Sequence, residues 1–171
     1  MENIPLLGLF AILLLLILLS AVFSASETAM MAVNRYRLKH QADSGNVAAQ
    51  RVLKLLENPD KLLGTILVGN NITNLTAPTI ATIIGLRLFG DVGIAIATGA
   101  LIIIVLIFAE VAPKTLAAQF PEKIAFPSSW LLLALQRVLK PLIIMVNFLV
   151  KSNHPLCLLS RLSIELSLIH I

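Results

Sequence analysis

The sequence predicts an all-α integral membrane protein with three transmembrane helices and amphipathic juxtamembrane helices. Of its 171 residues, 58% are hydrophobic and only 13% are charged, whereas a soluble domain has roughly 45–50% apolar and about 25% charged residues. The apolar residues are also concentrated in three long runs, and a spanning helix needs about 20 such residues. Composition and pattern together exclude an ordinary soluble domain.

The first predicted span covers residues 5–33. Its first part, residues 5–23, contains no charge and a single hydroxyl, that of Ser20. A cleaved signal peptide would have a basic segment before a shorter apolar core, but the charged residue that precedes this run is Glu2. We therefore expect the helix to be retained.

The basic segment that follows is predicted to form juxtamembrane helices over about 35–57. Residues 34–61 hold six of the thirteen lysines and arginines, and their apolar residues recur at helical spacing. Asn58, Pro59 and Asp60 then supply an N-cap, a proline in the first turn and an acidic residue, which is a typical helix start. The second span is predicted over 60–87.

Gly90 and Asp91 predict a tight turn before a third span over 92–117. The last hydrophobic region, 128–150, is interrupted by Arg137 and Lys140, and a lipid-facing charge costs about 2.5–3.5 kcal/mol. The helices predicted over 121–150 are therefore a kinked interfacial or re-entrant pair rather than a fourth span.

The distribution of basic residues predicts the orientation. Six lie between the first and second spans, six lie after Ala109, and none precedes the first span. Because basic residues favour the cytoplasmic side, we expect the N-terminus outside and the C-terminus in the cytoplasm. An even number of spans would leave one basic cluster outside.

The end of the chain is expected to be incomplete. Residues 151–165 are predicted to begin a cytoplasmic region. Residues 166–171, LSLIHI, resemble the translation of a transposase recognition end used in preparing sequencing libraries. We therefore expect the natural protein to continue beyond about residue 165.

Polar side chains recur inside the predicted spans. Ser20, Ser24 and Glu27 are spaced i, i+4, i+7 and share one helical face, and Asn70 and Asn74 share another. An asparagine in hydrocarbon needs a partner, so the pair is either an interhelical hydrogen-bond seam or a set of oxygen ligands. The serines, equally, can bond to carbonyls of their own helix.

Glu110 ends the third apolar run and is the main candidate for a functional charge. An acidic residue at this depth is expensive unless it has a role. Pro113 removes a backbone donor three residues later, and Lys114 is the candidate partner at i+4. Asn71 points away from the asparagine face, and Glu27 is either functional or hydrated at the interface.

These oxygens are hard ligands, which suit Mg²⁺, Ca²⁺ or Mn²⁺. Of these ions, we predict Mg²⁺. The predicted ligands are Ser20, Ser24, Asn70, Asn74 and Glu110. The secondary candidates are Glu27, Asn71, Pro113 and Lys114.

Four motifs in order give the chain a resemblance to the transmembrane domain of the CorC/cyclin M family of magnesium transporters, in particular its bacterial hemolysin-C-like members. They are FSASET at 23–28, NRYRLKH at 34–40, LVGNNITN at 67–74 and FAEVAPKTLA at 108–117. Ala25 replaces a glycine that many relatives have in the first motif.

The resemblance implies a homodimer in the bacterial inner membrane that exports Mg²⁺ in exchange for Na⁺. It also implies an ion site of first-helix serines, second-helix asparagine and a glutamate before a proline, which match the five predicted ligands. In this family ATP binds to paired cystathionine-β-synthase (CBS) domains, and these are absent from the chain, so ATP is not assigned to it.

We therefore expect a transporter of Mg²⁺ or another divalent cation in contact with the lipid bilayer. The alternative is a non-transporting membrane anchor or sensor for cytoplasmic CBS domains. An enzyme is not expected because the chain has neither G-x-S-x-G nor H-E-x-x-H. Nucleic-acid binding is not expected because the basic residues flank hydrophobic segments.

Overall fold

The computed structural model describes residues 5–152, and the side chains of residues 5–139. Every regular element in this range is a helix, which confirms the all-α class. Residues 166–171 and all but the start of 151–165 lie outside the described part. In chain order the helices are α1 (Leu6–Ala32), α2 (Arg35–Asp43), α3 (Val47–Leu56), α4 (Pro59–Ile104), the π-helix η1 (Val105–Val111), α5 (Ala112–Gln119) and α6 (Pro121–Ser152).

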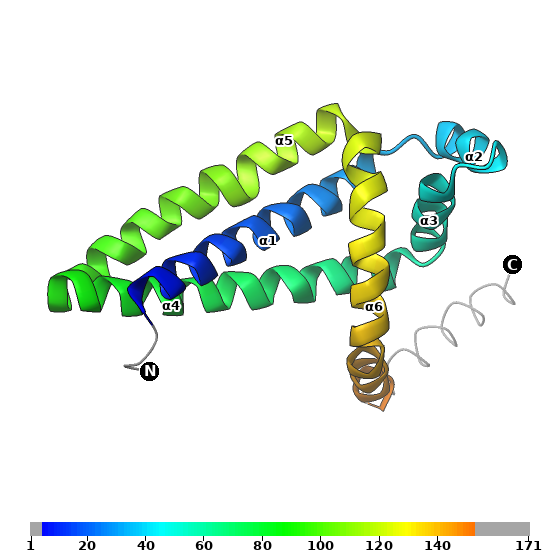
Figure 1. Cartoon of the computed structure of the whole chain (residues 1–171). Coiled ribbons are helices and arrows are strands. Elements are labelled where there is room, and N and C mark those ends of the chain that lie inside the picture. The colour runs from blue at the N-terminus through cyan, green and yellow to red at the C-terminus, as the bar shows by residue number, and fades with distance from the viewer. Residues whose placement is uncertain (1–4, 153–171) are drawn as a thin grey trace, which may run out of the picture. The chain divides into compact units, whose positions relative to one another are not determined.

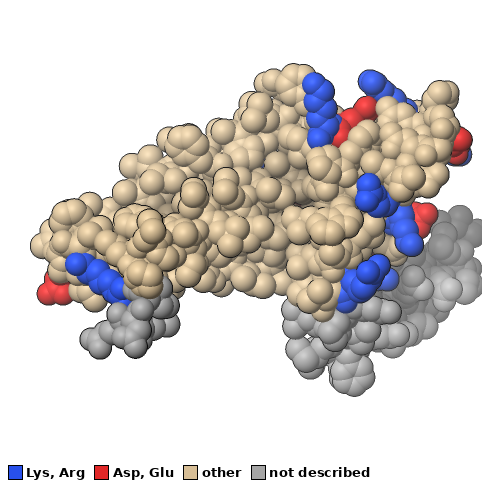
Figure 2. Space-filling model, in the orientation of Figure 1, with Lys and Arg blue, Asp and Glu red and all other residues tan. Residues whose placement is uncertain are grey.

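Helices α1, α4 and the continuous η1–α5 segment form a bundle (Figure 1). Two stretches of the described chain are long and apolar enough to cross a membrane, Leu6–Ala32 and Pro59–Gln119. On the face shown in Figure 2 the charged side chains gather at the two ends of this bundle, and its middle shows none. Large apolar side chains such as Leu14 and Ile103 are exposed on the outside, as expected for contact with lipid.

The second stretch reverses direction at Gly90, as the sequence predicted. Gly90 has φ 63° and ψ −149°, while the residues around it are helical. A Cβ atom added to Gly85 would meet the carbonyl oxygen of Gly93, so the two arms touch backbone to backbone. The 61-residue stretch is thus a hairpin with one arm before Gly90 and one after it.

We expect Gly90→Ala to destabilise the hairpin by about 1–3 kcal/mol, because this φ/ψ region is essentially restricted to glycine. No atom lies within 4 Å of an added Cβ at Gly90, so the cost is conformational rather than steric. Thermal unfolding of the purified protein in detergent measures it. Gly99→Ala is the control, since Gly99 has equally open surroundings without a positive φ, and equal unfolding temperatures for the two variants would contradict the prediction.

Two short helices, α2 and α3, occupy the segment that was predicted to be juxtamembrane. Each begins at an asparagine, Asn34 or Asn46, whose side-chain oxygen accepts hydrogen bonds from two backbone N–H groups of the first turn. Their buried residues, including Leu38, Val52 and Leu55, join one core with the end of α1 and the start of α4. This core holds the C-terminal end of α1, which follows the polar residues Ser20 and Ser24, against the start of α4.

Helix α6 runs as one helix from Pro121 to Ser152, whereas the sequence predicted a kinked interfacial or re-entrant pair of helices over 121–150. The first compact unit of the chain ends at Gln136, directly before Arg137. Up to that point, α6 contributes Ala125 and Leu132 to the core of the bundle. No further span is found in α6 within the described residues.

Candidate functional site

The side chain of Ser20 joins α1 to α4 in the middle of the bundle. Its hydroxyl oxygen lies 3.0 Å from Oδ1 of Asn70 and 2.8 Å from Oδ1 of Asn74. Ser20 is buried, and both asparagines are half-buried. Asn70 and Asn74 therefore lie on one face of α4, as their helical spacing predicted, because both contact the same hydroxyl.

The Ser20 hydroxyl has one hydrogen to donate, but it contacts two asparagine oxygens. A serine hydroxyl carries a single hydrogen, so it donates to one amide oxygen at a time. The other amide oxygen then faces the serine oxygen without a hydrogen between them, unless that amide turns its NH₂ group inward or a cation enters. Converging oxygens of this kind are suited to binding a hard cation.

Close packing of α1 on α4 brings these oxygens together. A Cβ added to Gly69 would lie 2.7 Å from the ring of Phe23. Phe23 is only 6% exposed, so its ring has little room to move. Gly69 immediately precedes Asn70, and Phe23 follows Ser20 by three residues, so this contact sets the separation of the two helices at the cluster.

Ser24 lies one turn beyond Ser20 and differs from the other hydroxyls of its helix. Its hydroxyl oxygen is buried and has no hydrogen-bond partner in the described part of the chain. Ser26 and Thr28, by contrast, donate to the carbonyls of Val22 and Ser24, one turn back. The expected alternative, in which a serine bonds only its own helix, thus applies to Ser26 and to neither predicted ligand.

Glu110 lies in the π-helix η1. The N–H of Ala112 donates to the carbonyl of Ile107, five residues back, and Pro113 has no N–H to offer the carbonyl of Ala109. A π-turn before a proline relieves the clash between the proline ring and that carbonyl. The Glu110 side chain is half-buried, and within the described chain it has neither an ion pair nor a hydrogen bond.

Asn74 and Glu110 line the same pocket, which has a volume of about 300 Å³. Pro78 lines it as well and has no N–H to donate to the carbonyl of Asn74, one turn back. Pro78 and Pro113 therefore each leave one helical carbonyl, that of Asn74 or of Ala109, without its usual N–H partner one turn on. The rest of its wall is mostly apolar, from residues such as Leu101 and Leu106.

Of the secondary candidates, Glu27 and Lys114 contact each other. Nζ of Lys114 lies 3.9 Å from Oε2 of Glu27, and both side chains are nearly half exposed, so the pair contributes little stability. Lys114 was the predicted partner of Glu110, and it pairs with Glu27 instead. Asn71 is exposed on α4, as its position off the asparagine face predicted.

The structure thus links four of the five predicted ligands and leaves Ser24 without a bond to them. Ser20, Asn70 and Asn74 are joined by hydrogen bonds, and Asn74 shares its pocket with Glu110. Among the described residues, no hydrogen bond joins Glu110 to the serines. Sequence reasoning missed Pro78, although a proline within an apolar run, one turn after a predicted ligand, was a readable signal.

The chain matches the family model of the cyclin M transmembrane N-terminal domain over residues 11–154. It is 56% identical over 129 residues to UPF0053 inner membrane protein YfjD of Escherichia coli, a match covering 75% of the chain and 30% of that protein. A UPF0053 protein of Haemophilus influenzae is 48% identical over 152 residues, which is 89% of the chain and 36% of that protein.

A shorter match has a more specific name. The polyamine export protein of Escherichia coli is 43% identical over 60 residues, or 35% of the chain and 13% of that protein. The chain spans about a third of the length of the first two relatives. The match to a transmembrane domain and to an inner membrane protein confirms the predicted location in the bacterial inner membrane. The chain belongs to the cyclin M transmembrane-domain family, which includes the UPF0053 proteins.

Proposed function

We propose that the chain is the membrane domain of a transporter that exports Mg²⁺ in exchange for Na⁺. The observation that carries this proposal is the convergence of the Ser20 hydroxyl with two asparagine oxygens. These atoms lie inside an apolar bundle, and Asn74 also lines the pocket of Glu110. Burying oxygen atoms away from water costs free energy unless a cation or a polar group contacts them.

The site would hold a transported ion rather than a permanent one. No group of three or more His, Cys, Asp or Glu that could hold a metal occurs among the described residues, so Glu110 is the charge next to several neutral oxygens. Mg²⁺ is usually bound by one or two carboxylates and keeps several of its waters. Ser24, with its unpartnered hydroxyl, would complete the oxygen set. Because one carboxylate neutralises only half of the charge of Mg²⁺, the ion is held weakly enough to dissociate.

Our proposed topology has three membrane spans, with the N-terminus outside and the C-terminus in the cytoplasm. The reversal at Gly90 supports this proposal, because it divides the 61-residue apolar stretch into two arms of spanning length. The basic residues of α2 and α3 would then lie on the cytoplasmic side.

Export needs a second ion because of its electrical cost. Moving one charge against the membrane potential costs about 2.3 kcal/mol per 100 mV, so a divalent cation costs roughly 4.6 kcal/mol at the same potential. Entry of Na⁺ down its gradient would supply this energy. Glu27, half exposed near the end of α1, is our candidate for contact with that ion.

We propose a homodimer as the working unit, and Asn71 on α4 supports it. Its side chain is exposed in an apolar helix and has no hydrogen-bond partner among the described residues, which is costly in lipid. A second copy of the chain would supply a partner. A mass of one chain, measured by light scattering after subtracting bound detergent, would contradict the dimer.

Transport by the reconstituted protein tests the function. We expect Mg²⁺ trapped with a Mg²⁺-sensitive dye in proteoliposomes to leave faster when Na⁺ is high outside than when Na⁺ is equal on both sides. Replacing Na⁺ by choline at the same ionic strength is the control. Equal rates with and without the gradient would contradict Na⁺ coupling, and no flux above that of protein-free liposomes would favour the anchor or sensor.

Polyamine export is a second candidate for this chain, and the pocket of Glu110 favours it. A carboxylate at the edge of a mostly apolar pocket of about 300 Å³ suits an alkylammonium ion as well as a metal ion. The same proteoliposomes distinguish the two substrates. If Mg²⁺ is carried, a tenfold excess of Mg²⁺ reduces Mg²⁺-isotope efflux more than spermidine does, whereas efflux of labelled spermidine but not of Mg²⁺ would replace our proposal by the second one.

A further inference from the structure

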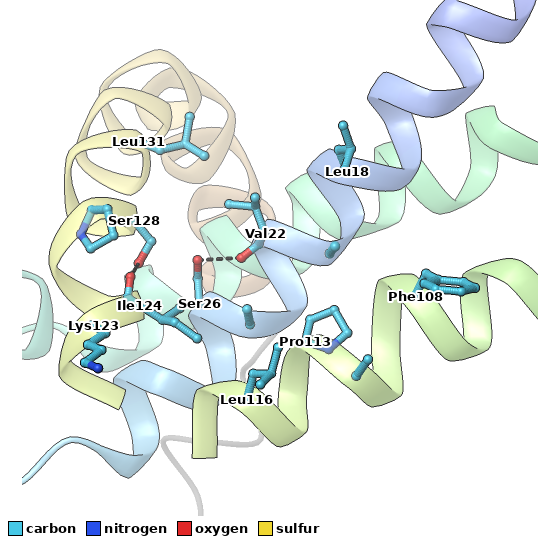
Figure 3. A pocket seen from close by; sticks show the side chains of 14 residues that line it. Leu18, Val22, Ser26, Phe108, Pro113, Leu116, Lys123, Ile124, Ser128 and Leu131 are labelled. Carbon is cyan, nitrogen blue, oxygen red and sulfur yellow. Dashed lines mark hydrogen bonds between the residues drawn. The ribbon is translucent and has the colours of Figure 1, made fainter. Parts of the chain in front are cut away.

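A larger pocket, of about 740 Å³, lies between α1, the η1–α5 segment and the start of α6 (Figure 3). Its size falls within the range of about 300–1,000 Å³ that is typical of small-molecule sites. It shares no lining residue with the pocket of Asn74 and Glu110. The larger side chains that form its walls are Leu18, Val22, Phe108, Leu116, Ile124 and Leu131.

The two hydroxyls in these walls bond to their own helices. Ser26 donates to the carbonyl of Val22 at 2.6 Å, and Ser128 donates to the carbonyl of Ile124 at 2.8 Å, as the dashed lines in Figure 3 show. Their hydrogen atoms are therefore not offered to the pocket. The walls present hydrocarbon, so a hydrated cation would find few ligands here and a hydrocarbon chain would be solvated well.

One charged residue, Lys123, lines this pocket. Its ammonium group lies 4.9 Å from the centre of the Phe120 ring, and no carboxylate among the described residues pairs with it. The neighbouring Glu122 binds elsewhere, to Arg37 at 3.1 Å and to Gln41 at 3.2 Å. The pocket thus combines a long apolar wall with an unpaired positive charge at the start of α6.

We infer that this pocket binds one acyl chain of an anionic phospholipid, with the lipid phosphate beside Lys123. The apolar surfaces of α1 and α5 that open onto it, including Leu18 and Leu116, are exposed and face lipid in a membrane protein. Basic pockets beside spanning helices favour anionic headgroups, and a zwitterionic lipid carries its own cation beside the phosphate. This site binds lipid whether the transported ion is Mg²⁺ or a polyamine.

Native mass spectrometry of the detergent-purified chain tests this inference. The protein is titrated with phosphatidylglycerol and with phosphatidylcholine that carry the same acyl chains. We expect the wild type to retain one phosphatidylglycerol molecule at least fivefold more than phosphatidylcholine. Lys123→Gln should lose that preference, and Lys61→Gln, which changes an exposed lysine outside the pocket, should keep it.

Two variants that fill the pocket separate the acyl chain from the headgroup. Ala112→Phe and Leu18→Trp enlarge exposed wall residues, so both should retain less of either lipid while keeping the unfolding temperature of the wild type. Equal retention of the two lipids by the wild type would overturn the inference. A change of dimer fraction in the filled variants, with lipid retention unchanged, would overturn it in favour of a second copy of the chain as the occupant.

Discussion

Glu110→Gln is expected to reduce the proposed Mg²⁺ transport by more than a hundredfold while leaving the fold intact. The substitution removes the charge and keeps the shape of the side chain. Glu110 lines a pocket together with Asn74. It forms no ion pair among the described residues, so the substitution breaks none. Two unit charges 4 Å apart attract by about 4 kcal/mol at an effective dielectric constant of 20, and each 1.4 kcal/mol is about tenfold in binding.

The measurement is the initial rate of Mg²⁺ efflux from proteoliposomes, together with the unfolding temperature in detergent. Glu57→Gln is the matched control, because Glu57 is exposed at the end of α3 and loses the same charge. Glu110→Asp should retain part of the activity, since the charge remains but moves back by one methylene. Transport by Glu110→Gln at the wild-type rate would show that Glu110 is not part of the ion site.

The sequence was sufficient to predict that residues 5–119 are mostly helical, and to predict the faces of two polar clusters. The spacing of Ser20 and Ser24, and of Asn70 and Asn74, follows from 3.6 residues per turn, so each pair had to share a face. That both asparagines would meet Ser20 did not follow, because the rotation of α4 against α1 depends on the packing of Gly69 on Phe23.

Three features depended on tertiary structure or on small energy differences. The π-helix at Glu110 is one extra residue in a turn, and Pro113 suggests a local distortion without specifying its form. The pairing of Lys114 with Glu27 rather than with Glu110 joins residues far apart in the chain. Helix α6 continues through Arg137, so an isolated charge in an apolar run did not decide where that helix ends.

Gly69→Ala is expected to disturb the site without touching any of its ligands. The added methyl would lie 2.7 Å from the ring of Phe23, and overpacking of a filled core costs about 1–3 kcal/mol. If α1 moves away to relieve the contact, Ser20 separates from Asn70 and Asn74, and Mg²⁺ binding weakens by roughly five- to a hundredfold. Isothermal titration with Mg²⁺ measures this change.

A second substitution decides whether helix separation is the cause. Gly69→Ala combined with Phe23→Leu removes the ring that the methyl meets, so it should restore most of the lost Mg²⁺ affinity even though the core has been changed twice. Gly64→Ala on the same helix is the control, since no atom lies within 4 Å of a Cβ there. If the double variant binds Mg²⁺ no better than Gly69→Ala alone, the distance between α1 and α4 does not control the site. If the double variant recovers Mg²⁺ affinity, the contact between Gly69 and Phe23 controls that affinity although neither residue binds the ion. This contact holds the Ser20 hydroxyl against both asparagines.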